Sequence, residues 1–487
     1  MEKKPEQQEN DFAATLFICI NCSVAASIFG TPWAFVQVGW ASALILSIIG
    51  VILLSLLGVV LIQVLTRMNV IKDYIGQGYT ISHVPMTEIF RNMPKSNYIK
   101  TPNEISDNTP LLSTENHNDL FFSYELTLIC RILLGGVMEK ILSITIITTS
   151  TIFLMGCTSV FASSLVSVIP LGPMNTCNIF TDPSFENWCR YKYMVFVALF
   201  ALITCTMTLF FHFTEQRWYL ITVAFGRILA ILLMAITSLI ALGENQTLDD
   251  DESLKVDIEA FNREGVGIAL PIIFLSMGFH IMIPELLEPL SNKAYSIKVI
   301  VLTFFIAFCM IILLCLTTIF CLNNVKPLIT LNWATYSNGV DPSDRAWWAY
   351  IIDGYVSLFP AVDVTSVFAI LLCNSAANLN ALSYETIDNK NNTNDDNFKG
   401  KVFLLCLTLI LPMYFYDIGI LFALAGCVNL IVLMFFISIL GLASVTIVPE
   451  KCVFDNFLAN KKVLIGVTIC SMLILIYLWF SFLGYFF

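Results

Sequence analysis

A few ionisable side chains lie within long apolar segments of this 487-residue chain, and each could do chemistry there. A charged group inside a membrane costs at least about 2.5–3.5 kcal/mol on insertion scales, so such residues are functional candidates. Asp363 could bind a sodium ion or carry a coupled proton. His280 could relay protons or gate the cytoplasmic side, because imidazole titrates near neutral pH, or it could be structural. For Arg227, deep within its segment, we expect a carboxylate or free carbonyl groups as partners.

Two of the apolar segments are interrupted by glycine and proline. Gly30 and Pro32 interrupt the first segment, and Pro271, Gly278 and Pro284 interrupt the sixth. Unwinding a helix inside the membrane frees N–H groups, which attract a carboxylate, and C=O groups, which attract an ammonium or a cation. An amino acid zwitterion is the natural small ligand for this pattern. Glycine and proline are also common in membrane helices, so it is their paired occurrence that favours a transporter.

The composition indicates which elements hold these residues. Hydrophobic residues make up 57% of the chain, charged residues only 13%, and the mean hydropathy is +0.80. Soluble domains carry roughly 25% charged residues, so a soluble enzyme, a disordered regulator and a secreted disulfide scaffold are excluded. A net charge of −11 argues against a nucleic-acid partner. No nucleophile triad, phosphate-binding loop or metal-ligand cluster is visible, so we expect neither an enzyme nor a cofactor, apart from Na⁺ or H⁺ as a coupling ion.

These features predict an all-α polytopic membrane protein, with residues 1–11 as a cytoplasmic tail and residues 12–487 as one transmembrane transporter domain. A spanning helix needs about 20 mostly apolar residues, and eleven segments qualify, the ninth and tenth being separated only by a turn signal at residues 416–419. They divide into five plus five plus one, which makes the two interrupted segments equivalent members of an inverted repeat. The predicted spans are 12–38, 42–66, 138–169, 193–211, 218–242, 265–287, 297–322, 348–372, 402–416, 418–448 and 464–487.

Basic residues determine the predicted orientation. Lys and Arg are about three times as frequent on the side of the N-terminus as on the opposite side, so the N-terminus is predicted to be cytoplasmic. The long polar loop 67–122 is then cytoplasmic, and the loops 170–192 and 243–264 are extracytoplasmic. Residues 124–135, which follow the long loop, have apolar residues at helical spacing and are predicted to form an interfacial amphipathic helix.

Several loop residues indicate covalent processing and sorting. Cys177 and Cys189 share an extracytoplasmic loop, where they form a disulfide or remain two free thiols. Asn245 lies in a glycosylation sequon on the same side. The cytoplasmic loop contains an acidic dileucine pattern, which would recruit sorting adaptors for lysosomal, vacuolar or endosomal membranes; a chance pair of leucines leaves the plasma membrane as the alternative. The pattern consists of Asp107, Leu111 and Leu112.

The first span resembles the first helix of the amino acid/auxin permease family, within the amino acid–polyamine–organocation superfamily. That helix typically reads N-x-x-x-G-x-G-I-L-G-L-P-Y-A-F, and Ala25 and Ser27 replace its first two glycines here. The sixth span is similar to a family segment with a histidine before a proline, although the spacing from His280 to Pro284 is one residue shorter. The first-span residues that match in register are Asn21, Gly30, Pro32, Ala34 and Phe35.

The resemblance implies the five-plus-five inverted-repeat fold of bacterial leucine transporters and secondary transport of amino acids, as in eukaryotic transmembrane amino acid transporters. Asn21 stands where sodium-coupled members place a cation-binding asparagine. In that fold the eighth span supplies hydroxyl groups to the same site, and Thr365 and Ser366 follow Pro360 there. The alternative for these polar residues is ordinary hydrogen bonding between helices, worth about 0.6 kcal/mol on average.

We therefore expect a secondary active transporter that moves amino acids by alternating access about both breaks, coupled to sodium or protons. The substrate carboxylate would meet backbone N–H groups of residues 27–30. The alternative is an amino acid sensor that signals through the loop 67–122. The predicted substrate-binding residues are Ala25, Ala26, Ser27, Gly30, Thr31, Phe274, Ser276 and Met277.

Overall fold

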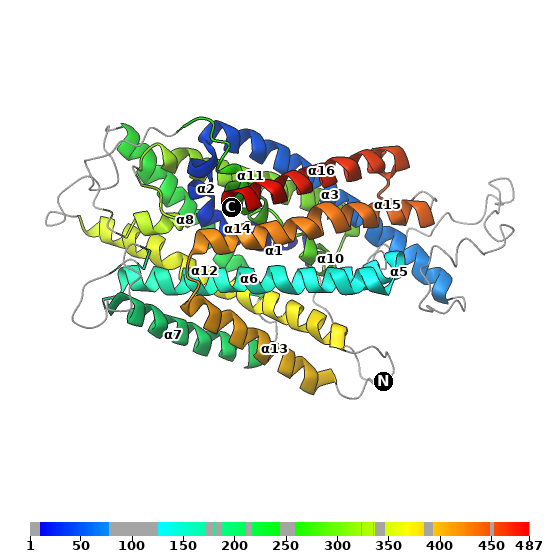
Figure 1. Ribbon diagram of the computed structural model, residues 1–487, viewed down its shortest axis with the longest axis horizontal. Helices are drawn as coiled ribbons and strands as arrows, with labels where there is room; N and C mark the ends of the chain where they lie inside the picture. Colours follow the sequence, from blue (N-terminus) through cyan, green and yellow to red (C-terminus); the bar gives the residue numbers. More distant parts are fainter. Residues whose placement is uncertain are drawn as a thin grey trace, which may run out of the picture.

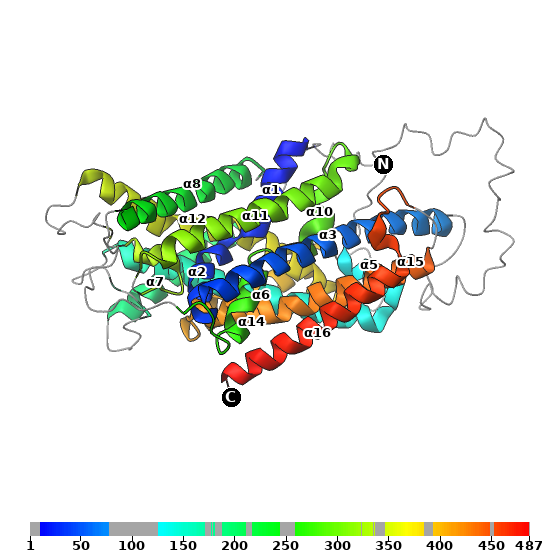
Figure 2. The ribbon, with the colours of Figure 1, turned by 90° about the horizontal axis from the view of Figure 1, so that it is seen from above.

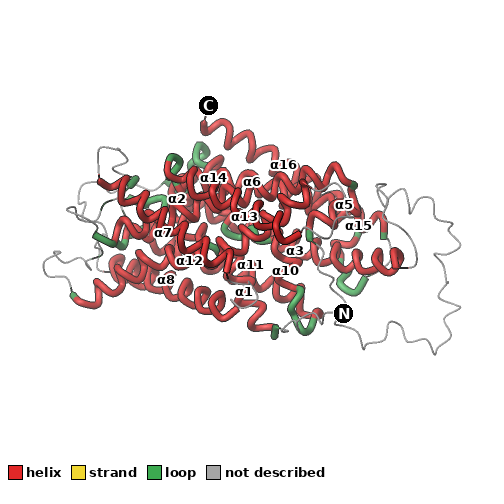
Figure 3. Tube along the Cα trace, turned by 90° about the horizontal axis from the view of Figure 1, so that it is seen from below, coloured by secondary structure: helices red, strands yellow, loops and turns green. Residues whose placement is uncertain are grey.

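Helices arranged side by side along one long axis make up the computed structural model of the chain (Figure 1). The structure describes residues 10–76, 125–170, 177, 179–180, 188–210, 217–243, 259–322, 324–334, 336, 346–383, 393–448 and 452–486. Within these ranges every element of regular secondary structure is a helix, and one isolated bridge joins Asn10 to Leu290. Views from above and below show the same elongated bundle, with α16 along one edge (Figures 2 and 3).

The described chain contains nine helical segments that are long and apolar enough to cross a membrane, or ten if the bent pair α1 and α2 is one span. The chain is therefore an integral multi-pass membrane protein. The crossing elements are α1 (Phe12–Val24) with α2 (Thr31–Val38), α3 (Trp40–Gly76), α6 (Gly136–Val168), α7 (Trp188–Phe210), α8 (Arg217–Gly243), α9 (Val266–Leu275) with α10 (Ile283–Leu287), α11 (Ser296–Ile319), α12 (Trp347–Ser383), α14 (Ile418–Leu430) with α15 (Ser438–Ile447), and α16 (Lys461–Phe486).

The predicted ninth span corresponds to α13 (Thr393–Ile410), which is not among these candidates because its first turns carry Asp and Lys residues. An eleventh crossing therefore stays a prediction. The predicted turn at residues 416–419 is confirmed: Asp417 caps α14 by accepting a hydrogen bond from the Ile420 N–H at 3.1 Å. Several helices extend beyond their predicted boundaries; α7, for example, already begins at Trp188, and α12 continues to Ser383.

When α13 is counted as the ninth span, each of the first four spans packs against the span five positions later in the chain. α1 lies beside α10 and α2 lies beside α9, so the halves of the two interrupted spans pair in opposite order. α3 packs against α11, α6 against α12, and α7 against α13. This pairing agrees with a repeat of five spans.

Backbone hydrogen bonds join the two interrupted spans at both of their ends. At one end, the Asn10 N–H donates to the Pro289 carbonyl at 2.6 Å. At the other end, the Asn262 N–H donates to the Val38 carbonyl at 2.8 Å. Gly39 follows with a φ of +85°, a conformation that glycine adopts without strain. The start of the first span is therefore hydrogen-bonded to the end of the sixth span. The end of the first span is hydrogen-bonded to the segment that leads into the sixth span.

α3 extends beyond the predicted boundary at residue 66, which shortens the predicted loop 67–122. Arg67 is only 1% exposed within the helix. Its guanidinium donates to both carboxylate oxygens of Asp455 at 2.8 Å and to the Val448 carbonyl at 3.3 Å. The end of α3 is therefore anchored to the segment between α15 and α16. The sequence carries no signal for this contact, because its partners are 388 positions apart.

The predicted amphipathic helix is present as α5 (Leu126–Leu134), which ends at Gly135 with a φ of +96°. Its buried face includes Ile129 and Leu133, and it packs against α6 and α15. Its other face is more accessible, with Leu128 37% exposed. The period of apolar residues therefore identified both the helix and its packed side.

In the structure Cys177 is joined to Cys189 by a disulfide, with the two Cα atoms 5.9 Å apart. The bond connects the segment after α6 to the first turn of α7. The sequon residue and the sorting pattern lie outside the described residues, as do most of the loops 67–122 and 243–264. These residues are Asn245, Asp107, Leu111 and Leu112.

We expect Arg67→Ala to lower the stability of the protein strongly, because it leaves the carboxylate of Asp455 without its partner. Breaking a buried ion pair costs about 3–5 kcal/mol. Thermal unfolding of the full chain in detergent measures the loss. Arg131→Ala is the control, because its pair with Glu139 is 3.6 Å long, with side chains 29% and 21% exposed, and such exposed pairs contribute about 0–1 kcal/mol. Equal decreases in Tm for both variants would contradict the expectation.

Candidate functional site

The first span is broken where the sequence predicts. α1 ends at Val24, a 3₁₀ turn η1 (Ala26–Gly30) follows, and the axis of α2 is bent by 43° relative to that of α1. Pro32 lies in the first turn of α2, where its missing N–H is not needed. The last carbonyl groups of α1 have no partners within that helix and are open to other donors.

The sixth span is broken between α9 and α10. Residues 276–279 are not helical, and a 3₁₀ turn η5 (His280–Met282) leads into α10, which has Pro284 in its first turn. Pro271 lies within α9 and does not end it, so Gly278 marks the break. Because α1 lies beside α10, α2 beside α9, and η1 also contacts α9, the two breaks lie where the two spans meet.

A buried ion pair lies next to the first break. Arg227 on α8 and Asp363 on α12 are both 0% exposed, and Nε and Nη2 of the guanidinium donate to the carboxylate. Nη1 donates to the main-chain carbonyl of Asn21 at 2.9 Å. Asn21 is in the last turn of α1, so this carbonyl is one that the break leaves open. Both kinds of partner expected for Arg227 are therefore confirmed.

The guanidinium supplies the positive charge at the C=O end of the broken helix. Asn21 and Asp363 are brought together through Arg227, but the two hydroxyl residues make other contacts. Thr365 Oγ1 is hydrogen-bonded to the Tyr219 hydroxyl and also donates to a carbonyl of its own helix. Ser366 Oγ donates to the Asp363 carbonyl at 2.8 Å. Of the predicted cation ligands, Asp363 and the Asn21 carbonyl therefore contact a protein cation, whereas the hydroxyls of Thr365 and Ser366 are used in other hydrogen bonds.

Three polar side chains at the break of the first span are buried and have no hydrogen-bond partner: both amide atoms of Asn21, and the hydroxyls of Ser23 and Ser27. Each is at most 1% exposed. An unsatisfied buried polar group costs about 1–3 kcal/mol, so this cluster favours a polar ligand or water beside it. Ala25, Ala26, Gly30 and Thr31 are also buried here, and Thr31 Oγ1 donates to the Ile28 carbonyl at 2.6 Å.

The predicted substrate-binding residues of the sixth span are buried, but the structure shows them in contact with helices. Phe274 and Met277 approach Gly50 of α3, where an added Cβ atom would be 3.4 Å from the Phe274 ring and 3.7 Å from the Met277 methyl group. Ser276 Oγ donates to the Ile272 carbonyl at 2.8 Å. A role for these three side chains in binding stays a prediction.

His280 makes one hydrogen bond from an otherwise apolar position. Its Nε2–H donates to the Leu54 carbonyl on α3 at 2.9 Å, since a carbonyl can only accept. Its ring lies 5.2 Å from the ring of Phe304, and Nδ1 has no partner. Nε2 therefore has a structural function, while Nδ1 is the atom that could accept a proton.

Asn429 on α14 is a site residue that the sequence reasoning missed. Its Nδ2 donates to the Gly278 carbonyl at 3.3 Å, and its Oδ1 is buried without a partner. A π-helical segment η10 (Ile431–Ile437) follows directly, and such segments are frequent at functional sites. A signal was available, since Asn429 is a polar residue within the apolar run 418–448.

No protein-family model matches the chain. The chain is similar to a curated protein of Caenorhabditis elegans named "Transmembrane protein 104 homolog", with 25% identity over 244 residues. The match covers 47% of this chain and 46% of that protein, so the chain spans about half the length of this relative. The name of the relative agrees with a membrane protein.

We expect Asp363→Asn and Arg227→Met each to destabilise the protein, because each leaves the other charge buried without its counter-ion. Breaking such a pair costs about 3–5 kcal/mol, whereas replacing both members by apolar residues is often neutral or stabilising. The double variant Arg227→Met, Asp363→Leu should therefore be more stable than either single variant. Thermal unfolding in detergent compares them, and a double variant with the summed loss would contradict the expectation.

We also expect Gly278→Ala to be destabilising, because its Cβ atom would lie 2.6 Å from Asn429 Nδ2 and 2.9 Å from the Phe274 carbonyl oxygen. Overpacking of this kind costs about 1–3 kcal/mol. Gly354→Ala on α12 is the matched control, since no atom lies within 4 Å of the added Cβ there. The Tm of Gly354→Ala should equal or exceed that of the wild type. A Gly278→Ala protein as stable as this control would contradict the expectation, because it would show that the break accommodates the added methyl group without loss of stability.

Proposed function

We propose that this protein is a secondary active transporter of amino acids that works by alternating access about the breaks in its first and sixth spans. The observation that carries the proposal is that both interrupted spans are broken and meet at their breaks. Chance glycine and proline residues in two helices would not place the breaks together. The resemblance of the first span to the amino acid/auxin permease family supports the same function.

The unpartnered polar groups of the first break fit the ends of an amino acid. Asn21 offers both a donor and an acceptor, and Ser23 and Ser27 offer hydroxyls that can do either. A carboxylate would accept from these donors and from nearby backbone N–H groups, and an ammonium would donate to the acceptors. The ligand is proposed to be small, because every side chain of η1 is buried.

The coupling ion is proposed to bind away from Asn21, Thr365 and Ser366. A sodium ion at these residues would lie near the guanidinium of Arg227, and two positive charges about 4 Å apart repel by about 4 kcal/mol at an effective dielectric constant of 20. Coupling is therefore proposed to use a proton or a cation held at another site.

The sensor alternative depends on the loop 67–122, most of which lies outside the described residues, and no contact of the described chain favours it. A lysosomal, vacuolar or endosomal location is proposed from the dileucine pattern, with the N-terminus in the cytoplasm.

Uptake of labelled amino acids into proteoliposomes, with imposed proton or sodium gradients, tests the proposed function. We expect at least one amino acid to accumulate, and Ser27→Ala to reduce uptake roughly 10-fold or more, as the loss of a hydrogen bond to a charged ligand predicts. Ser471→Ala on α16 is the matched control, because its hydroxyl is also buried and unpartnered but lies on another helix. If no amino acid accumulates under any gradient, the proposal fails.

A further inference from the structure

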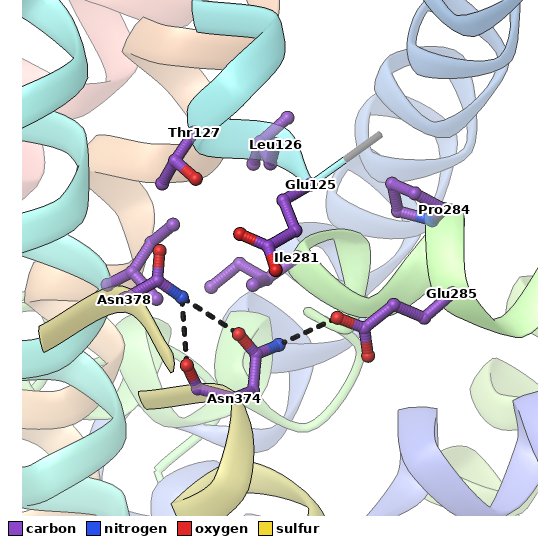
Figure 4. A pocket seen from close by; sticks show the side chains of 9 residues that line it. Glu125, Leu126, Thr127, Ile281, Pro284, Glu285, Asn374 and Asn378 are labelled. Atoms are coloured by element: carbon purple, nitrogen blue, oxygen red, sulfur yellow. Dashed lines mark hydrogen bonds between the residues drawn. The ribbon is translucent and has the colours of Figure 1, made fainter. Parts of the chain in front are cut away.

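A polar pocket lies where α10 and α12 meet the segment that leads into α5 (Figure 4). Its polar side is formed by the carboxyl groups of Glu125 and Glu285, the hydroxyl-bearing Thr127, and the amides of Asn374 and Asn378, and apolar residues of α5, α6, η5 and α10 complete the lining. The pocket is separate from the break of the first span, because none of its lining residues belongs to α1, η1 or α2.

The hydrogen bonds in the pocket fix the orientation of its two amides. Asn374 Nδ2 donates to Glu285 Oε1 at 3.4 Å, since a carboxylate oxygen can only accept (Figure 4). Asn374 therefore presents Oδ1 to Asn378, whose Nδ2 donates to it at 2.8 Å and to the Asn374 main-chain carbonyl at 3.0 Å. The remaining atom, Asn378 Oδ1, is an acceptor, and it has no partner although Asn378 is only 3% exposed.

The pocket is therefore rich in acceptors. Glu125 and Glu285 both line it, and no Lys, Arg or His is among the described residues that do so. Two carboxyl groups and a buried amide oxygen that lacks a donor favour a positive ligand. Oxygen atoms of carboxylates and amides are the ligands that hard cations such as Na⁺, K⁺, Mg²⁺ and Ca²⁺ prefer.

We propose that this pocket binds one hard metal cation through Glu125, Glu285 and Asn378. The cation would join three elements: α12, the segment before α5, and α10, which is the second half of the broken sixth span. Binding would hold α10 against α12 and stabilise the arrangement seen here. A further role as the coupling ion rests on the proposed transport function, whereas binding itself does not.

Thermal unfolding of the purified full chain in detergent, after treatment with chelator, tests the site. NaCl, KCl, MgCl₂ and CaCl₂ are titrated separately, with N-methylglucamine chloride as the control for ionic strength. We expect one of the four metal cations to raise the Tm saturably. Glu285→Gln should shift half-saturation to at least about 10-fold higher concentration, since a charge-assisted contact is worth about 1.5–3 kcal/mol.

Two further variants keep the test decisive. Glu125→Gln changes an exposed residue, so it should fold normally and still weaken the cation effect. Glu264→Gln is the control: it removes an exposed carboxylate shortly before α9, at the other end of the sixth span, and it should titrate as the wild type does. The proposal is overturned if no metal cation raises the Tm, if acidification alone does so, or if Glu285→Gln and Glu125→Gln respond as Glu264→Gln does.

The uptake assay separates this site from the proposed function. If the cation both binds and couples, uptake should depend on it, and Glu125→Gln should lose that dependence. Stabilisation by a cation without uptake of any amino acid would retain the site and overturn the transporter. Uptake without stabilisation by any metal cation would retain the transporter and overturn the site.

Discussion

The buried contact of Arg227 with Asp363 and the Asn21 carbonyl constrains the centre of this protein. A guanidinium and a carboxylate cannot remain separately in an apolar interior, so α8 and α12 must stay in contact there. The third hydrogen bond brings the last turn of α1 to the same point, because a broken helix has carbonyl groups to satisfy. The break of the first span and the ion pair are therefore parts of one arrangement: without the break, the guanidinium would lack an acceptor on α1.

Close packing of backbones determines how the two broken spans meet. An added Cβ at Gly265, directly before α9, would lie 1.9 Å from the carbonyl oxygen of Gln37 in α2. An added Cβ at Gly426 of α14 would lie 2.2 Å from the carbonyl oxygen of Pro271, so α14 also packs closely against α9. Within a membrane, small residues allow helices to approach closely, and dispersion contacts replace the hydrophobic driving force. Together with the hydrogen bonds at both ends, these contacts make α1, α2, α9 and α10 one packed unit. Movement that opens one end of this unit must break hydrogen bonds there.

The two polar regions of the interior differ in charge, and this difference suggests different ligands. At the first break the charges of Arg227 and Asp363 compensate each other, which leaves uncharged donors and acceptors for a ligand of zero net charge. The pocket beside α10 carries two carboxylates and no described basic residue, which favours a cation. Because α12 carries Asp363 and also Asn378, one helix contributes to both regions.

The sequence by itself determined the class of the protein, the extent of most helices and the position of both breaks. These depend on local properties: apolar length, and the inability of glycine and proline to continue a helix. Tertiary structure alone decided the partners. Arg67 was assigned to a loop because the apolar run ends at residue 66, and its partner Asp455, 388 positions away, was not visible from the sequence. Thr365 and Ser366 were grouped with Asn21 as a cation site, but the positive charge there belongs to Arg227, whose direction depends on how α8 packs. Glu125, Glu285 and Asn378 share a pocket for the same reason, since only the folded chain brings them together.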